Sequence, residues 1–129
     1  MSEKEKRSKI VILIVDDNLL FTERMIDILH ELNNIRYINV ASDYNEACRI
    51  VKHEMPDLVL LDINLPGKNG IDFLRLIKEE NKKCTVVMLT NHSDDYYRQL
   101  CKQIGADHFL DKSNDFARVP EIVSRIHAN

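Results

Sequence analysis

The stretch Ile10-Val11-Ile12-Leu13-Ile14-Val15-Asp16-Asp17 is an apolar run that ends in two carboxylates. Three later runs also end in a polar residue: Leu58-Val59-Leu60-Leu61-Asp62, Val86-Val87-Met88-Leu89-Thr90 and Phe109-Leu110-Asp111-Lys112. Short apolar runs that alternate with helical patterns are typical of buried parallel strands. The carboxyl ends of parallel strands lie at one edge of a sheet, where ligands bind in open α/β folds. The polar residues are therefore predicted to meet at that edge.

The rest of the chain supplies the alternating helices. Strands are predicted at about 9–15, 37–41, 58–62, 84–89 and 108–110, and helices at about 18–32, from Ser42 or Asp43 to before Pro56, 70–80, 93–104, and from Pro120 to near Ile126. Right-handed crossovers between parallel strands leave few topologies. The predicted fold is α/β, a flavodoxin-like doubly wound five-stranded parallel sheet of order 2-1-3-4-5 with five helices.

Composition limits the possible classes of protein. The chain has 129 residues, 44% of them hydrophobic and 30% charged, which predicts one globular domain. A net charge of −3 gives no electrostatic reason to expect nucleic acid or an acidic membrane as a partner. No apolar stretch approaches the roughly 20 residues that span a bilayer. We expect a flexible arm at residues 1–8 and a domain over 9–129.

The number and spacing of the cysteines indicate the redox state of the cellular compartment. The three cysteines, Cys48, Cys84 and Cys101, have no C-x-x-C spacing. An odd number of scattered thiols favours a reducing compartment, so we expect a cytoplasmic protein.

The predicted strand order makes Asp16, Asp17 and Asp62 neighbours. Two unit charges about 4 Å apart repel by about 4 kcal/mol at an effective dielectric near 20, so the cluster needs compensation. Mg²⁺ (or Mn²⁺) and the ammonium of Lys112 would supply it. Asp62 is central in the sheet, which favours it as a nucleophile on phosphorus, with Asp16 and Asp17 holding the metal. The Thr90 hydroxyl would follow the new phosphoryl group.

These motifs in combination resemble the receiver domain of two-component response regulators. The resemblance covers about residues 9–127 and rests on four segments: Val15-Asp16-Asp17-Asn18, Leu60-Leu61-Asp62-Ile63-Asn64-Leu65-Pro66-Gly67, Leu89-Thr90 and Leu110-Asp111-Lys112. It implies a signalling switch in which Asp62 receives a phosphoryl group from a histidine kinase or a phosphotransfer protein. It also implies no further enzyme activity beyond self-phosphorylation and slow autodephosphorylation.

The resemblance assigns roles to several positions. Mg²⁺ would be bound by the three aspartates and the backbone carbonyl of Asn64. Thr90 and Lys112 would sense the phosphoryl group, and Phe109 would swing inward with Thr90. The surface formed by the fourth helix, fifth strand and fifth helix would then change its affinity for a downstream protein. Such a switch works through a pre-existing two-state equilibrium.

The chain departs from the family pattern near the site. Ser113 follows the lysine where the family usually has a proline in a cis bond, so the geometry of this bond is open. Asn91 stands where a small residue is usual and would narrow access to the aspartate. Asn64, Asn91 and His92 flank the site at positions that tune phosphoryl lifetime. Phe109 has no hydroxyl, so its switching would be steric.

Other classes of protein remain as alternatives. A metal-dependent aspartyl-phosphate phosphatase would need a second aspartate at the position of Asn64. A flavin-binding electron carrier would suffer repulsion between the flavin phosphate and Asp16-Asp17. A receiver-like module that binds partners without phosphorylation also remains. The chain is expected to be a stand-alone receiver of the chemotaxis type or a segment of a longer protein, and a monomer or a phosphorylation-dependent dimer.

Overall fold

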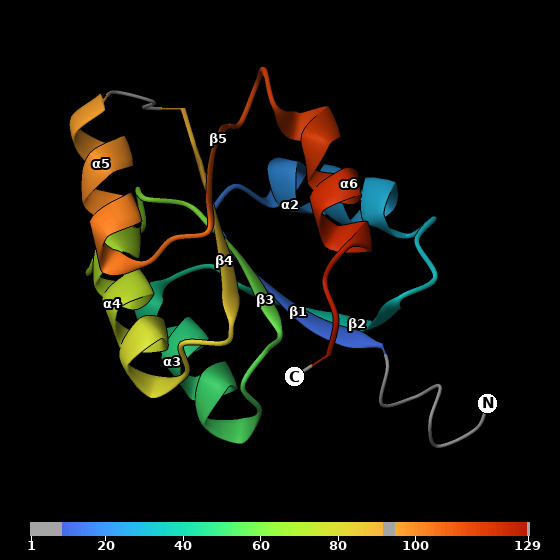
Figure 1. Cartoon of the computed structure of the whole chain (residues 1–129), viewed down its shortest axis with the longest axis horizontal. Coiled ribbons are helices and arrows are strands. Elements are labelled where there is room, and N and C mark those ends of the chain that lie inside the picture. Colours follow the sequence, from blue (N-terminus) through green and yellow to red (C-terminus); the bar gives the residue numbers. More distant parts are fainter. Residues whose placement is uncertain (1–8, 92–94, 129) are drawn as a thin grey trace.

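The computed structural model, which describes residues 9–91 and 95–128, contains one parallel five-stranded sheet (Figure 1). The strands are β1 (Ile10–Val15), β2 (Ile35–Ala41), β3 (Leu58–Leu61), β4 (Thr85–Thr90) and β5 (His108–Asp111). Their order is β2-β1-β3-β4-β5, and every neighbouring pair is parallel. The predicted fold class and strand order are confirmed.

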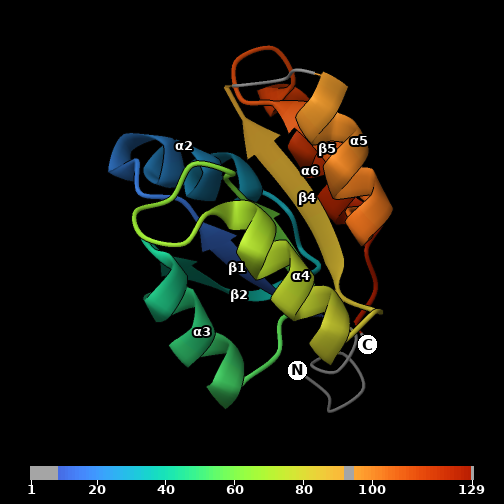
Figure 2. The same cartoon turned by 90° about the vertical axis from the view of Figure 1, so that its left-hand side faces the viewer.

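Helices cover both faces of the sheet. They are α2 (Leu19–Leu29), α3 (Tyr44–His53), α4 (Gly70–Glu80), α5 (Asp95–Ile104) and α6 (Val119–Ser124), with the short 3-10 helix η1 (Phe116–Arg118) before the last. Helices α3, α4 and α5 lie on one face, and α2 and α6 on the other (Figures 1 and 2). Among the described helices, none is long and apolar enough to cross a bilayer.

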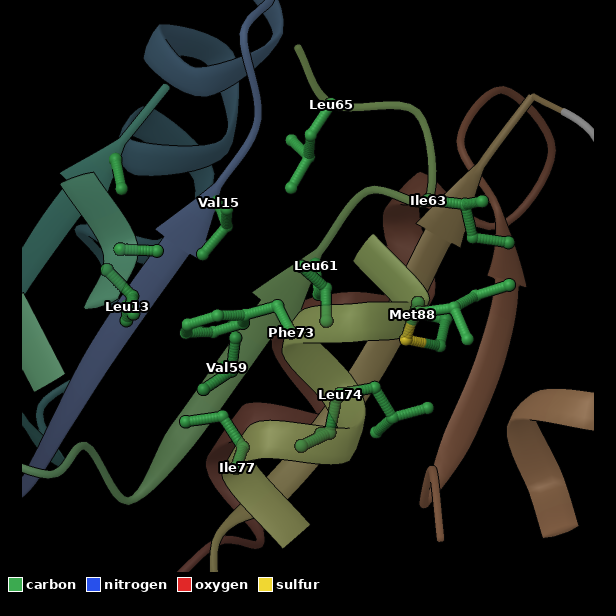
Figure 3. Packing of buried hydrophobic residues seen from close by; sticks show 14 of the residues in the cluster. Leu13, Val15, Val59, Leu61, Ile63, Leu65, Phe73, Leu74, Ile77 and Met88 are labelled. Carbon is green, nitrogen blue, oxygen red and sulfur yellow. The ribbon is translucent and has the colours of Figure 1, made fainter. Parts of the chain in front are cut away.

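Alternation along the strands divides the core into two clusters. Leu13 and Val15 of β1 join the cluster under α3, α4 and α5, while Ile12 and Ile14 join the cluster under α2 and α6. Figure 3 shows the first cluster, where Phe73 of α4 packs over β3. Burying one side chain of this size contributes about 1.5–3 kcal/mol, so both faces of the sheet are strongly fixed.

Several element boundaries differ from the predicted ones. Helix α2 ends at Leu29 rather than 32, because Leu32 N–H bonds the Leu29 carbonyl in a tight final turn. Strand β2 begins at Ile35, which pairs with Ile10. Strand β4 extends to Thr90, and the last helix ends at Ser124. The predicted cap of α3 is Asp43, whose side chain accepts the Glu46 N–H.

The loop between β3 and α4 is closed at a glycine. The N–H of Gly70 donates to the carbonyl of Ile63 at 2.7 Å. A Cβ built on Gly70 would lie 2.0 Å from the backbone oxygen of Asp62. Asn69 caps the following helix in a reciprocal capping box with Asp72. The backbone of Asp62 is therefore held by direct contact with the first turn of α4.

We expect Gly70→Ala to lower the free energy of unfolding by about 3 kcal/mol, because the new methyl group collides with fixed backbone. The matched variant is Gly67→Ala in the same loop. Gly67 has φ +79° but open space around its Cα, so alanine there costs about 1 kcal/mol of conformational strain. Urea unfolding of both variants measures the difference. Equal losses would show that the contact between Gly70 and Asp62 is not close.

Candidate functional site

The structure brings the predicted polar residues to one edge of the sheet. Asp16, Asp62 and Lys112 directly follow β1, β3 and β5, and Thr90 ends β4. All four are buried, whereas Asp17 is exposed. Asp16, Asp17 and Asp62 each offer one carboxylate oxygen, and these oxygens lie within 4.8 Å of one another. The parallel registers of β1, β3 and β4 align the strand ends and so produce this arrangement.

Lys112 lies between the two buried carboxylates. Its Nζ is 2.6 Å from Asp16 Oδ2 and 3.1 Å from Asp62 Oδ2. The same ammonium lies 4.6 Å from the centroid of the Phe21 ring. The lysine thus compensates two negative charges that the fold places close together.

The second oxygen of each carboxylate bonds to nearby backbone. Asp16 Oδ1 accepts the N–H of Asn18 at 2.8 Å, and Asp62 Oδ1 accepts the N–H of Asn64 at 3.2 Å. Both carboxylates are therefore oriented by their own loops on one side and by Lys112 on the other. A carboxylate oxygen has two lone pairs, so these contacts leave room for a further ligand.

Burial and neighbouring charges act against each other on both members of the central pair, and the pKa of each is raised overall. Burial raises the pKa of Asp62, and the charge and hydrogen bond of Lys112 only partly offset this effect. Burial lowers the pKa of Lys112, but its hydrogen bond with Asp16 and the charges of both aspartates more than offset it, so the pKa of Lys112 is raised overall. The lysine stays protonated, while a charged Asp62 remains costly in this environment.

The donor set fits a divalent metal ion. Carboxylate oxygens are the ligands that hard cations such as Mg²⁺ prefer, usually beside waters and a phosphate. One exposed and two buried aspartates supply such oxygens at the mouth of the site. The backbone carbonyl of Asn64, predicted as a further ligand, belongs to an exposed residue next to this cluster. Its role stays a prediction.

The two predicted switch residues lie on neighbouring strands. Thr90 is fully buried at the end of β4 and lies in register with Asp111 of β5. Phe109 is half-buried and packs against the cluster under α4 and α5. The Arg98 guanidinium of α5 lies 4.8 Å from its ring centroid and donates to its carbonyl at 3.2 Å. These contacts join the Phe109 ring to the outer surface of α5.

Of the three residues predicted to flank the site, the structure describes two. Asn64 and Asn91 are both exposed at the rim of the site. His92 lies outside the described residues. The bond between Lys112 and Ser113 is trans, because the described chain contains no cis peptide.

The loop after Lys112 is organised by two aspartates instead of a proline. Asp111 Oδ1 accepts the N–H groups of Ser113 and Asn114 at 2.8 and 2.9 Å. The N–H of Asp111 donates to Asp115 Oδ2 at 2.8 Å. This hydrogen-bonded turn carries the chain from β5 into η1.

Sequence reasoning missed the aromatic side of the site. Neither Phe21 nor Phe116 was predicted to lie at the site. In the structure their rings form an edge-to-face pair with centroids 5.8 Å apart. They line a cleft of about 360 Å³ together with Lys112 and Arg24. Helical spacing could place Phe21 on one face of α2, but nothing in the sequence indicated its contact with the lysine.

Comparison with known proteins agrees with this geometry. Residues 12–124 match the response regulator receiver domain family. The chain belongs to the receiver domain family of response regulators, as the sequence motifs predicted.

Individual relatives support the same family. The chain is 31% identical over 123 residues to the transcriptional regulatory protein DegU of Brevibacillus brevis, covering 95% of this chain and 52% of DegU. It is 35% identical over 115 residues to protein CcdB of Bacillus subtilis, covering 89% and 95%. A CheY-like receiver domain protein from Methanospirillum hungatei has the same fold, with a TM-score of 0.81 at 23% identity, covering 90% and 91%. The chain thus spans about half of DegU and nearly all of CcdB.

The raised pKa of Asp62 predicts a pH-dependent effect of Asp62→Asn in metal-free buffer. A folded-state pKa above the unfolded value makes the folded protein bind the proton more tightly. The stability that this group contributes is complete below the unfolded pKa and is lost as pH rises through the folded one. The variant is therefore expected to be more stable than wild type at pH 7, with the difference closing as pH falls toward 4. Urea unfolding across this range measures it. A variant less stable than wild type at pH 7 would contradict the dominance of burial.

Proposed function

We propose that this receiver domain is a phospho-accepting switch of a two-component system and that Asp62 is the acceptor. The observation that carries the proposal is the pairing of buried Asp62 with the Lys112 ammonium, next to Asp16 and Asp17. A carboxylate with a neighbouring cation and a set of hard oxygen ligands suits attack on a phosphoryl group.

In the proposed reaction an Asp62 carboxylate oxygen attacks phosphorus in line with the leaving group. The new oxygen–phosphorus bond gives a mixed anhydride on the aspartate. The bond that breaks joins phosphorus to a histidine nitrogen of the donor, or to the carboxylate oxygen of a small acyl phosphate. The leaving group takes the electron pair, and the imidazole of a histidine donor regains its proton from solvent. Lys112 donates to a phosphoryl oxygen and offsets its charge.

Asp16, Asp17, Asp62 and the backbone carbonyl of Asn64 would hold Mg²⁺ or Mn²⁺. A bound divalent ion supplies charge neutralisation at the phosphoryl oxygens. Asp17 is exposed, so the site is open to ions and donors from solvent. Asn64, Asn91 and His92 would adjust access and the lifetime of the phosphoryl group.

The proposed output passes through Thr90 and Phe109. The Thr90 hydroxyl would bond the new phosphoryl group, and the Phe109 ring would move inward beside it. The ring is tied to α5 by Arg98, so its movement would change the surface of α5, β5 and α6. Phosphorylation would then shift a two-state equilibrium toward the form that binds a downstream protein.

The partners we propose are a sensor histidine kinase, a histidine phosphotransfer protein, or both, with a downstream protein as the target. Nucleic acid and membrane are not proposed as partners of this domain. The domain would be a monomer or a phosphorylation-dependent dimer in the cytoplasm. DegU is named as a transcriptional regulatory protein, and the chain spans about half of its length. The proposed function therefore concerns the receiver domain alone.

Acetyl phosphate with Mg²⁺ is expected to add one phosphoryl group to the wild-type chain, as measured by intact mass. Asp62→Asn is expected to remain unmodified, because an amide is too poor a nucleophile to form the anhydride. Thr90→Ala is expected to accept the group without the change in the α5–β5–α6 surface, which amide hydrogen exchange reports. Modification of Asp62→Asn to the wild-type level would refute the assigned acceptor.

Mg²⁺ is expected to raise the melting temperature, since a ligand of the folded state stabilises it by about 1.4 kcal/mol at ten times its Kd. Asp17→Asn should remove most of this response. Asp17 is exposed, so the metal-free melting temperature of the variant should stay close to that of wild type. Thermal scans with and without EDTA provide the measurement. An equal Mg²⁺ response in both proteins would exclude Asp17 from the metal site.

A further inference from the structure

We propose that Phe21 is a positioning residue that holds Lys112 for phosphoryl transfer, an inference that rests on the function proposed for Asp62. The ring of Phe21 presents its face to the ammonium, with Nζ 4.6 Å from the centroid. A protonated lysine at this distance from an aromatic ring is attracted by the quadrupole of the ring. Phe21 thus contacts the lysine directly and reaches the acceptor only through it.

A closed circuit of contacts fixes this arrangement. Asp16 Oδ1 accepts the N–H of Asn18, and Asn18 Oδ1 accepts the N–H of Phe21 at 3.0 Å. The Phe21 ring then contacts Lys112, which returns to Asp16 Oδ2. The cap that starts α2 therefore sets the position of the ring relative to the carboxylate. The helix start, the aspartate and the lysine are geometrically linked.

Phe116 packs against the same ring. It meets Phe21 edge to face, and the Arg24 guanidinium of α2 lies 5.4 Å from the Phe116 ring centroid. Phe116 begins η1, directly after the turn that Asp111 and Asp115 organise. In this chain the segment after the lysine is therefore anchored to α2 by aromatic packing.

The position of the lysine matters because it faces two attractive carboxylates. Lysine is a compact charge on a flexible four-carbon stem, so it can move within an acidic cluster. The two carboxylates alone do not fix one position for the ammonium, because it can bond either oxygen of each carboxylate, including the oxygens that a metal and a phosphoryl group must reach. The ring face offers the ammonium a contact that neither carboxylate supplies, and so favours the position it shares with Asp16 Oδ2 and Asp62 Oδ2. The ring thus holds the lysine at one oxygen of Asp62 and leaves the other oxygen to the metal and the phosphoryl group.

The test compares Phe21→Leu, Phe21→Tyr and Leu19→Ala as full chains. Leucine keeps apolar packing but removes the ring face, whereas tyrosine keeps the ring. Leu19 is 68% exposed in the same turn of α2 and serves as the control. The rate of phosphorylation by acetyl phosphate with Mg²⁺ is followed by intact mass. Phe21→Leu is expected to react roughly fivefold more slowly, the size of a partly buried cation–π contact, with Phe21→Tyr within about twofold of wild type.

The outcomes separate this inference from the proposed function. A wild-type chain that acetyl phosphate does not modify refutes the assignment of Asp62 and, with it, this role of Phe21. A modified wild type with an equally fast Phe21→Leu, or with Phe21→Tyr as slow as Phe21→Leu, refutes the role of Phe21 alone. A slow Leu19→Ala would show a general disturbance of α2 and would also overturn it.

A second measurement needs no variant that risks misfolding. A ring face near the ammonium shifts the proton resonances of the lysine side chain upfield through the ring current. In wild type, the methylene protons next to Nζ of Lys112 are expected upfield of those of the other lysines, and Phe21→Tyr should keep the shift. Resonances within the ordinary lysine range would overturn the proposal, whatever the phosphorylation rates.

Discussion

The contact of one ammonium with two buried carboxylates is the interaction on which the functional edge of this domain depends. Lys112 follows β5, which lies two strands from β3 in the sheet, or about 10 Å at the usual strand spacing. Only a long side chain spans this distance, and it must pass the end of β4 to reach Asp62 and Asp16. The hydrogen bonds of Asp111 with the turn that follows Lys112 therefore help to place the ammonium. This ammonium offsets the charges of Asp62 and Asp16, which follow strands two and three positions away in the sheet.

The contact of Lys112 with Asp62 does not fully offset the cost of burying the charge of Asp62. Burial still raises the pKa of Asp62 although Lys112 is in contact with it. A fold selected only for stability would replace such a cluster with apolar groups, because buried ion pairs rarely repay the cost of desolvation. A divalent cation bound by the three aspartates, as proposed for this site, would offset the remaining cost. In this respect the electrostatics and the family membership point to the same chemistry.

The fold, the site edge and the placement of Lys112 beside the aspartates were predictable from the sequence, but the individual side-chain contacts within the site were not. Apolar runs ending in Asp16, Asp62 and Thr90 determine which residues share an edge, because parallel strands end on the same side. The pairing of Lys112 with Asp16 depends on side-chain reach, and the Phe21 contact depends on how η1 packs on α2. Helical and strand periodicity carries no information about either. The early end of α2 escaped prediction for a similar reason, since its final turn depends on local hydrogen bonding.

Strand β5 and the residue after it connect the carboxylate cluster to the surface of α5 over a short stretch of chain. Lys112 contacts the acceptor, and Phe109, three positions earlier, contacts Arg98 on α5. Phe109 lies on β5, which is held on one side by β4, and Lys112 directly follows this strand, at the start of a turn tied to α2 through Phe116. A change at Asp62 would therefore need no long path to reach α5, because Phe109 and Lys112 are only three positions apart in the chain. By the same reasoning, the aromatic pair on α2 and η1 would take part in the proposed switch, since it anchors the segment that follows Lys112.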